Sequence, residues 1–429
     1  LPNPVPLFDR PVAYKPPQGG VHYRSELPGM HIEQRLFDKL DAVRAFAATN
    51  SIDRFLANPH DARLGIVSTG KAHLDLMQAL ADLGLRENDL ERQGIRLYKV
   101  GLTFPLEPSR MLAFADGLDE ILVGEEKGPI VEEQLKSLLY DSRHTQPRVI
   151  GKRDVGGDAL IPRVDELRPY RLRPILREWL RTRGVEMPIR AAEREEPVEC
   201  GAPVGNRVPY FCAGCPHNTS TKVPEGSRAY GGIGCHYMAR WMNRNTEGLI
   251  QMGGEGVNWV GLAPFTKTEH VFQNLGDGTF YHSGSLAIRS AIAAGVNITY
   301  KILVNDAVAM TGGQPVEGQP TVDAICEQLD GEGIKRIVVV SDDIKQFARD
   351  RFPTGVRFHP REELEMVQKQ LRLIPGVTAL IYVQTCAAEK RRRRKRGKFP
   401  NPARRLLINE QVCEGCGDCS AASNCIAVT

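Results

Sequence analysis

Four cysteines close to the end of the chain have the spacing of ligands to a metal centre. Cys413, Cys416, Cys419 and Cys425 are separated by two, two and five residues. A loop that wraps a cuboidal iron–sulfur cluster needs a thiolate at about every third residue, which this run supplies. Zinc sites usually combine two C-x2-C pairs that lie farther apart, so zinc and a fortuitous cysteine-rich tail are less favoured. The run predicts a [4Fe–4S] cluster, and Cys425 could ligate a different cluster from the other three.

Two expected strands farther upstream each end in a polar residue. Residues 270–275 lead into a Gly-Asp-Gly-Thr turn at 276–279, a helix follows, and the strand 298–304 then ends at Asn305. Neighbouring parallel strands place their carboxyl ends at the same sheet edge, where open α/β sheets bind ligands. The side chains of Asp277 and Asn305 are therefore expected to lie together.

Their chemistry suits a magnesium diphosphate. The carboxylate of Asp277, the amide oxygen of Asn305 and the carbonyl of Ala307 are hard oxygen donors of the kind that Mg²⁺ prefers. Gly276 and Gly278 let backbone N–H groups approach a pyrophosphate that the metal bridges. The pattern predicts such a ligand at this edge of the sheet.

The interval between the two elements makes the motif specific. Asp-Gly by itself is among the commonest turn dipeptides, so a turn without a ligand is the alternative. A Gly-Asp-Gly turn followed by a helix, a strand and Asn305 resembles the thiamine-diphosphate binding motif. A further segment is specific to a narrower group of proteins with this motif: Thr311, Gly312, Gly313 and Gln314.

Four other cysteines are expected near the same edge. Cys212 and Cys215 form a C-x2-C pair, Cys235 lies in a Gly-Ile-Gly-Cys-His run, and Cys386 ends a late strand. Together they could hold a second [4Fe–4S] cluster beside the thiamine site. Zinc on the same thiolates stays open, since structural zinc sites also use C-x2-C pairs. His217 either contacts the cofactor or supports the ligand loop from behind.

Alternating strands and helices must position these residues. The first half of the chain predicts strands at 64–68, 95–100, 120–123 and 148–150, and helices at 72–85, 108–116 and 130–140. The second half predicts strands at 270–275, 298–304, 336–341 and 379–383, and helices at 283–294, 344–351 and 361–373. Short buried strands separated by helices imply parallel sheets with right-handed crossovers.

The expected fold class is therefore α/β, with two parallel-sheet domains and a cysteine-rich tail. The boundaries are an extended N-terminal arm at 1–59, an α/β domain at 60–155, a helical linker at 156–204, a second α/β domain at 205–388, a basic linker at 389–410 and the tail at 411–429. Proline and glycine in the first thirty-odd residues suggest the arm, and the polar stretch 187–200 suggests the boundary.

Composition excludes several other classes of protein. The 429 residues have ordinary apolar and charged fractions, and neither a signal peptide nor an apolar run long enough for a membrane span occurs. Ten cysteines with cofactor-like spacing favour a reducing compartment, so we expect a cytoplasmic protein. The net charge of +4 does not by itself indicate nucleic acid. The basic run 390–396 is either a solvated linker or a surface for an acidic or phosphate-rich partner.

Several blocks together resemble one family. Residues 211–218, 232–238, 251–256, 272–279 and 305–314, with the cysteine tail, look like the indolepyruvate branch of the 2-oxoacid:ferredoxin oxidoreductases in its long bacterial single-chain form. The resemblance covers nearly the whole chain. It implies that 60–155 is a transketolase C-terminal-like domain, 205–388 a thiamine-diphosphate-binding domain, and 411–429 the start of a ferredoxin-like segment.

The resemblance also implies roles for individual residues. Mg²⁺ would be held by Asp277, Asn305 and Ala307, one [4Fe–4S] cluster by Cys212, Cys215, Cys235 and Cys386, and another by Cys413, Cys416, Cys419 and Cys425. Thiamine diphosphate would contact Asn218, Gly234, Gly276, Asp277, Gly278, Thr279, Asn305, Thr311, Gly312, Gly313 and Gln314. His217 is the catalytic candidate in this chain.

The implied activity is oxidative decarboxylation of an aryl 2-oxoacid, with coenzyme A taking the acyl group and the clusters passing electrons to ferredoxin. A homo-oligomer is implied for the full-length enzyme, without nucleic-acid or membrane partners. The pyrimidine-binding domain with its activating glutamate, the rest of the ferredoxin segment and the gamma-type domain are not in this sequence. We therefore expect an enzyme truncated at both ends. The alternatives are a non-oxidative thiamine decarboxylase and a non-catalytic zinc or iron–sulfur module that binds nucleic acid through the basic run.

Overall fold

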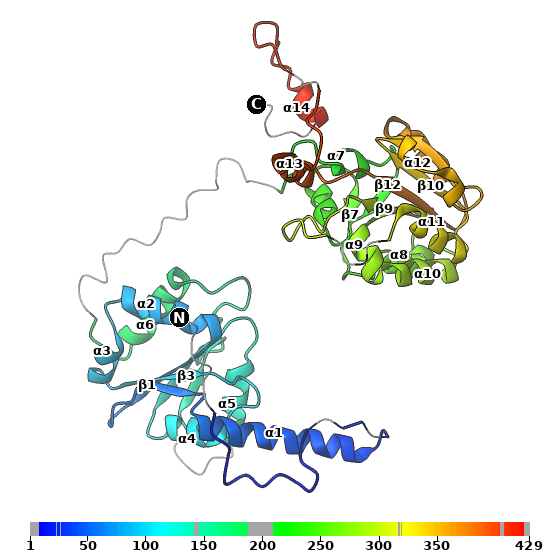
Figure 1. The fold of residues 1–429 in the computed structure, drawn as a ribbon. Helices are drawn as coiled ribbons and strands as arrows, with labels where there is room; N and C mark the ends of the chain where they lie inside the picture. Colours follow the sequence, from blue (N-terminus) through cyan, green and yellow to red (C-terminus); the bar gives the residue numbers. More distant parts are fainter. Residues whose placement is uncertain are drawn as a thin grey trace. The chain divides into compact units, whose positions relative to one another are not determined.

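The chain divides into two compact units, Leu1–Val204 and Gly205–Thr429, each built around its own β-sheet (Figure 1). The computed structural model describes residues 8–22, 24–25, 27–140, 146–187, 209–315, 318, 320–403 and 407–423. Within these residues, no helix is both long enough and apolar enough to cross a membrane. The predicted α/β fold class with two sheets is confirmed.

The first unit contains a five-stranded sheet in the order β1-β3-β2-β4-β5. Its strands are β1 (Arg54–Ala57), β2 (Leu64–Thr69), β3 (Ile95–Val100), β4 (Glu120–Gly124) and β5 (Arg148–Ile150). Strands β2 to β5 are parallel, as predicted, whereas β1 runs antiparallel to β3 at the edge. The sequence interpretation missed β1, which is held there by Phe55 packing against Tyr98 and Phe114.

Helices cover both faces of this sheet, because each carries an apolar stripe. Leu76 and Leu80 of α2 (Gly70–Asp82) and Leu90 of α3 (Glu87–Arg92) pack on one face. Phe114 of α4 (Pro108–Ala115) and Leu135 of α5 (Ile130–Tyr140) pack on the other. The result is a three-layer domain (Figure 1).

Residues expected to form a linker instead complete this core. Helix α6 (Pro169–Arg181) buries Leu172, Leu176, Trp179 and Leu180 in the same cluster as the apolar side of α2. Their spacing of four, three and one residues places them on one helix face. The predicted helical linker at 156–204 is therefore wrong for residues 167–185, which belong to the first domain.

The predicted extended arm is also wrong in part. Residues Met30–Asn50 form α1, a 21-residue helix. Proline and glycine are concentrated before residue 30, and none occurs between residues 30 and 50. An uninterrupted run without these two residues allows the helix to continue.

The second unit contains a seven-stranded sheet in the order β11-β10-β12-β9-β8-β6-β7, and every pairing is parallel. Its strands are β6 (Arg228–Tyr230), β7 (Thr246–Glu247), β8 (Val271–Gly276), β9 (Ile298–Val304), β10 (Ile337–Ser341), β11 (Arg357–Pro360) and β12 (Val377–Val383). The four predicted strands correspond to β8, β9, β10 and β12. The other three are short or lie at the edges, which weakens their signal in the sequence.

Helices again pack on both faces of the second sheet. On one face lie α8 (Val257–Leu262), α10 (Ser285–Ala294) and α11 (Val322–Gly331), and on the other α12 (Leu364–Leu371). The helix predicted at 344–351 is wrong: the segment forms two short 3₁₀ turns, η5 (Ile344–Gln346) and η6 (Arg349–Arg351). Phe347 and Phe352 pack together beside these turns, so local aromatic packing outweighs helix propensity there.

The predicted basic linker begins as a helix. Residues Ala387–Lys395 form α13, which starts directly after Cys386. Lys390 pairs with Asp342 at 3.4 Å, and Arg393 lies 3.8 Å from Asp306. The basic run is therefore partly attached to the second domain, so it is not simply a solvated linker. Helix α14 (Asp418–Ser423) lies in the cysteine tail.

Candidate functional site

The carboxyl edge of the second sheet gathers residues from four adjacent strands. These strands lie in the order β12, β9, β8 and β6. Cys386 follows β12 after two intervening residues, Asn305 and Asp277 directly follow β9 and β8, and Cys235 begins the short 3₁₀ helix η2 (Cys235–Trp241) that comes after β6. The backbone N–H of Cys386 donates to the carbonyl of Asn305 at 3.0 Å. The fold thus brings the predicted magnesium ligands and two of the predicted cluster ligands to one edge.

Asp277 and Asn305 are held in fixed positions by backbone hydrogen bonds. Oδ2 of Asp277 accepts the N–H of Asn305 at 3.0 Å, and Oδ1 accepts the N–H of Gly278 at 2.9 Å. Oδ1 of Asn305 accepts the N–H of Ala307 at 3.2 Å. Burial raises the pKa of Asp277 to about 6, and the hydrogen bonds from Asn305 and Gly278 oppose that rise. Such a desolvated carboxylate favours the approach of a cation.

A pocket of about 810 Å³ opens beside these residues. Its lining includes many of the predicted site residues: His217, Gly234, Cys235, Gly276, Asp277, Gly278, Thr279, Asn305, Ala307 and Thr311. Four predicted cofactor contacts are absent from the lining: Asn218, Gly312, Gly313 and Gln314. Gln314 instead donates through Nε2 to the carbonyl of Thr311 at 2.9 Å, within the same small loop. This volume is in the range of pockets that hold a cofactor-sized ligand.

Gly234 has a conformational reason to be glycine. Its φ is +155°, and an added Cβ would lie 2.6 Å from the ring of His236. By contrast, an added Cβ at Gly276 or Gly278 would make only ordinary contacts of 3.5 and 3.8 Å. The glycines of the Gly-Asp-Gly turn are therefore not required by the protein's own packing, which is consistent with a ligand that needs the space.

Two buried histidines, His217 and His236, lie next to each other in the lining of the pocket. The rings of His217 and His236 are 5.7 Å apart in an edge-to-face arrangement, and both side chains are almost fully buried. Burial lowers the pKa of His217 to about 3 and that of His236 to about 4. Nδ1 of His217 lies 3.2 Å from Oγ of Ser220, whereas Nε2 of His236 is buried without a hydrogen-bond partner. Nε2 of His236 is thus a buried polar atom that a ligand could satisfy.

We call Cys212, Cys215, Cys235 and Cys386 the edge cysteines. All four are free thiols, and each of the other three acts electrostatically on Cys215. Burial raises the pKa of Cys215 to about 12, and the neighbouring thiols add to that rise. Such a set binds metal only as thiolates, so the site favours a positively charged centre that draws the protons off.

Within the described residues, no group of three or more His, Cys, Asp or Glu side chains is placed to hold one metal ion. A single zinc ion needs its four ligands around one point, whereas each thiolate of a [4Fe–4S] cluster can bind a different iron atom. Gathered but separated thiols therefore fit a cluster better than zinc. The tail cysteines Cys413, Cys416 and Cys419 are exposed, and Cys425 lies outside the described residues.

Glu255 is a site residue that the sequence interpretation did not single out. Its carboxylate is fully buried and accepts the N–H of Gly253 at 2.7 Å and that of Ile233 at 3.3 Å. Burial raises its pKa. Its hydrogen bonds therefore connect the Met-Gly-Gly-Glu-Gly segment at 252–256 to Ile233, two residues before Cys235. The only sequence signal was an acidic residue within a glycine-rich run.

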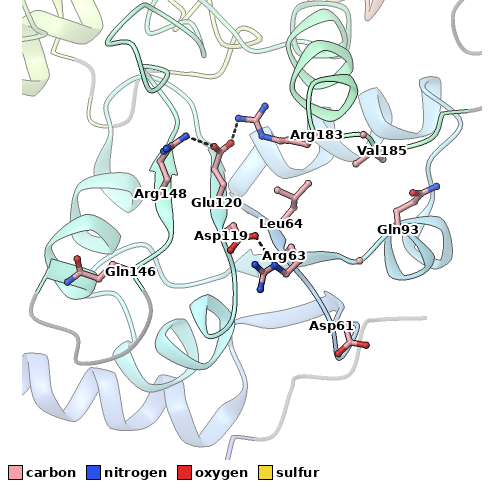
Figure 2. A pocket seen from close by; sticks show the side chains of 12 residues that line it. Asp61, Arg63, Leu64, Gln93, Asp119, Glu120, Gln146, Arg148, Arg183 and Val185 are labelled. Atoms are coloured by element: carbon pink, nitrogen blue, oxygen red, sulfur yellow. Dashed lines mark hydrogen bonds and ion pairs between the residues drawn. The ribbon is translucent and has the colours of Figure 1, made fainter.

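A second cavity, of about 680 Å³, lies at the amino-terminal ends of strands in the first unit (Figure 2). The buried Glu120 accepts a 2.6 Å hydrogen bond from Nε1 of Trp179 and pairs with Arg183 and with Arg148. Arg63 pairs with Asp119 at 2.8 Å. The charges around this cavity are thus largely paired with one another, and they indicate a structural role.

Comparisons with known proteins agree with this division of the chain. Residues 54–195 match the model of the indolepyruvate oxidoreductase domain, and residues 232–367 match the C-terminal TPP-binding domain of thiamine pyrophosphate enzymes. The indolepyruvate oxidoreductase subunit IorA of Thermococcus kodakarensis is 28% identical over 92% of this chain and 59% of its own length. IorA of Pyrococcus horikoshii is 28% identical over 87% of this chain and 56% of its own length.

The chain therefore spans less than two thirds of the length of these relatives. Among solved structures, a 2-oxoglutarate:ferredoxin oxidoreductase from Magnetococcus marinus aligns with 46% of this chain and 67% of its own. The identity is 16% and the TM-score is 0.33. At that score the alignment carries no argument about fold, which depends here on the strands and helices of the chain itself.

Proposed function

We propose that this chain, which belongs to the indolepyruvate oxidoreductase family, supplies the thiamine diphosphate and iron–sulfur sites for the oxidative decarboxylation of an aryl 2-oxoacid. The observation that carries the proposal is the pocket at the sheet edge, where Asp277, Asn305 and Ala307 lie beside the thiol of Cys235. A cation site next to cysteine thiols is what a thiamine enzyme needs if its reaction ends in electron transfer.

The diphosphate end of the cofactor would lie at the Gly-Asp-Gly turn. Asp277 and Asn305 would hold Mg²⁺ together with the carbonyl of Ala307, since all three supply hard oxygen ligands at the edge of the pocket. The backbone around Gly278 offers room for phosphate oxygens, because an added Cβ there would meet nothing closer than 3.8 Å. When bound, thiamine diphosphate would supply the electron sink for decarboxylation.

The protein's own groups would bind and shield the reacting end. Apolar side chains of Met252, Val308 and Met310 line the pocket and would exclude water. His217 and His236 are neutral at physiological pH because burial lowers their pKa values to about 3 and about 4. Neutral imidazoles can donate or accept one hydrogen bond without adding charge. We propose that His236 contacts the cofactor and that His217 lies behind it.

The edge cysteines would hold a [4Fe–4S] cluster close enough to accept single electrons from the reaction. The tail cysteines would hold another cluster, and ferredoxin would be the external acceptor. Coenzyme A would take the acyl group. These partners belong to the whole enzyme, and the chain covers 59% of a relative's length. In this proposal the glutamate that activates thiamine is supplied from outside residues 1–429.

The test is made on anaerobically purified protein. We expect Mg²⁺-dependent binding of thiamine diphosphate in calorimetry, and iron and acid-labile sulfide in equal amounts, with a [4Fe–4S] signal in electron paramagnetic resonance after reduction. Thiamine diphosphate binding without iron would instead support a non-oxidative decarboxylase. Zinc in place of iron, with salt-sensitive nucleic-acid affinity and no thiamine diphosphate binding, would support a non-catalytic module.

A further inference from the structure

Arg244 points into the second unit beside the edge cysteines. Nη1 donates to the carbonyls of His217 and Asn218 at 3.1 and 2.8 Å, and to Oγ1 of Thr221 at 2.8 Å. The guanidinium also lies over the ring of Phe211, 5.5 Å from its centroid. All of these partners are neutral. These contacts hold Nη1 of Arg244 in place without balancing the charge of the guanidinium.

The backbone around Arg244 is shaped for this inward position. The residues on either side, Asn243 and Asn245, both have φ near +49°. Asparagine tolerates this left-handed conformation better than most residues, because its side chain can hydrogen-bond locally. The Asn-Arg-Asn sequence thus builds a turn that directs the arginine inward.

Lys301 is a second cation in the same region, and it is fully buried. It lies in the middle of β9 with no exposed surface, and Nζ donates to the carbonyl of Lys222 at 2.9 Å. Nζ is also 5.7 Å from the centroid of Phe272. Burial and the nearby charge of Arg244 lower the pKa of Lys301 to about 7. A lysine placed among neutral groups is costly to charge.

Neither cation has a carboxylate partner among the described residues. The groups that act on Arg244 with the opposite charge are Cys215 and Tyr210, and both favour its protonated form. Arg244 and Lys301 repel each other. One fully buried and one half-buried positive charge, with only the Cys215 thiol and the Tyr210 hydroxyl as nearby groups that could become negative, are unfavourable in a metal-free protein. They become favourable if the thiols are ionised.

We propose that Arg244 and Lys301 are the counter-charges of the iron–sulfur cluster held by the edge cysteines, and that they raise its reduction potential. This inference rests on the proposed function. Four thiolates around an oxidised [4Fe–4S] core carry a net charge of about −2, which the two cations would balance. Reduction adds one more negative charge, so nearby cations stabilise the reduced cluster more than the oxidised one. Both residues are positioning residues, and neither contacts the substrate.

The test compares Lys301→Met and Arg244→Gln with two controls. Lys301→Met keeps an unbranched side chain of nearly the same length and removes its charge. Arg244→Lys keeps the charge but loses part of the hydrogen bonding to residues 217–221. It therefore separates the effect of the charge from the effect of those hydrogen bonds. Arg240→Gln removes an exposed arginine that precedes Arg244 by four residues. The cluster potential is measured by dithionite titration with mediators, followed by electron paramagnetic resonance.

We expect Lys301→Met and Arg244→Gln each to lower the equilibrium constant for reduction at least tenfold, which is about 59 mV for one electron. Arg244→Lys should retain most of the wild-type potential, and Arg240→Gln all of it. In the metal-free protein, Lys301→Met should raise the midpoint of thermal unfolding, because it removes an uncompensated buried charge. Equal potentials in all five proteins would overturn the inference while leaving the proposed function intact. A wild-type protein that takes up no iron at the edge cysteines would overturn both.

Discussion

The carboxylate of Asp277 and the backbone N–H of Asn305 form a 3.0 Å hydrogen bond across the adjacent strands β8 and β9. The two residues are 28 positions apart in the sequence, and the parallel pairing brings them together. The bond orients one carboxylate oxygen and fixes the start of the loop that carries Ala307. The position of the Asp277 carboxylate in the proposed magnesium site is therefore set by the pairing of β8 with β9.

Asp277→Asn should remove Mg²⁺-dependent binding of thiamine diphosphate while preserving the fold. Asparagine has the same size and keeps one oxygen that can accept the N–H of Asn305, but it lacks the negative charge. Loss of a supporting residue around a metal typically costs 10–100-fold in affinity, so loss of this ligand should cost at least about 100-fold. Calorimetry with Mg²⁺ and thiamine diphosphate measures the effect.

The matched control is Asp330→Asn, which removes the same charge from an exposed position on α11. It should bind the cofactor as the wild type does. Unchanged affinity in Asp277→Asn, with the circular dichroism spectrum of the folded protein, would show that Asp277 holds no metal.

The stability of the metal-free protein should rise with pH because of Lys301. Its pKa is lowered to about 7 in the folded state by burial and by the charge of Arg244, against about 10.4 in an unfolded chain. Between these two values the unfolded state binds more protons, so the free energy of unfolding increases with pH, by at most about 1.4 kcal/mol per pH unit. Below pH 7 this contribution is constant. Urea unfolding at several pH values measures the slope.

Lys301→Met should flatten that slope between pH 7 and 10. The exposed Lys335→Met, which removes a lysine from the surface of the same unit, should leave the slope unchanged. The interpretation fails if the wild type and Lys301→Met have parallel stability curves over this range.

Glu255→Ala should loosen the loop that carries Cys235. The change leaves the N–H groups of Ile233 and Gly253 without the acceptor that they share. A buried polar group without its partner costs about 1–3 kcal/mol, so the free energy of unfolding should fall by that amount. In the metal-free protein, Cys235 should also react faster with a thiol reagent. The control is Glu269→Ala, which changes an exposed glutamate that, like Glu255, precedes β8 in the sequence.

Cys386→Ser should abolish the proposed cluster at the sheet edge and spare the one in the tail. A cluster with four thiolate ligands holds about four iron atoms, so the iron content per chain should fall by that number. The control is Cys326→Ala, since Cys326 is buried in α11 among apolar residues. Iron and sulfide analysis under anaerobic conditions gives the answer. An unchanged iron content would exclude Cys386 as a ligand.

The central strands of both sheets could be predicted from the sequence, because they are short apolar runs between clear helices. The segments 95–100 and 298–304 coincide with β3 and β9 at both ends. The errors lie where tertiary contacts decide. Helix α6 has a charged, proline-containing sequence that suggests a linker, yet its apolar stripe completes the first core. Strand β1 has only four residues and depends on its pairing with β3.

The site was predictable where a motif fixes backbone geometry. The Gly-Asp-Gly turn and Asn305 lie at adjacent strand ends, as their interval along the chain indicated. Other contacts have no signal in a single sequence. Glu255 matters through its burial, and both Glu255 and Arg244 bond to partners from distant segments. His236 likewise stands out only because Nε2 has no hydrogen-bond partner.

The exposed basic residues at the end of α13 should speed the encounter with an acidic electron acceptor. Helix α13 begins at one of the proposed cluster ligands, Cys386, and runs for nine residues. Besides Arg392, which pairs with Glu389, four cations from the middle of the helix onward are exposed: Arg391, Lys395, Arg396 and Lys398. Clustered charge of one sign raises the association rate of an oppositely charged partner, and salt screens the effect.

Replacing these four residues by glutamine should slow electron transfer to ferredoxin about tenfold at low ionic strength, and the difference should disappear at about 0.5 M salt. The control carries glutamine at four exposed basic residues elsewhere in the unit: Lys267, Lys335, Lys345 and Arg357. Both variants lose the same net charge, so a local docking surface predicts that only the α13 variant is slow. Stopped-flow reduction of ferredoxin measures the rates. If both variants slow equally, net charge explains the effect and α13 is not the docking surface.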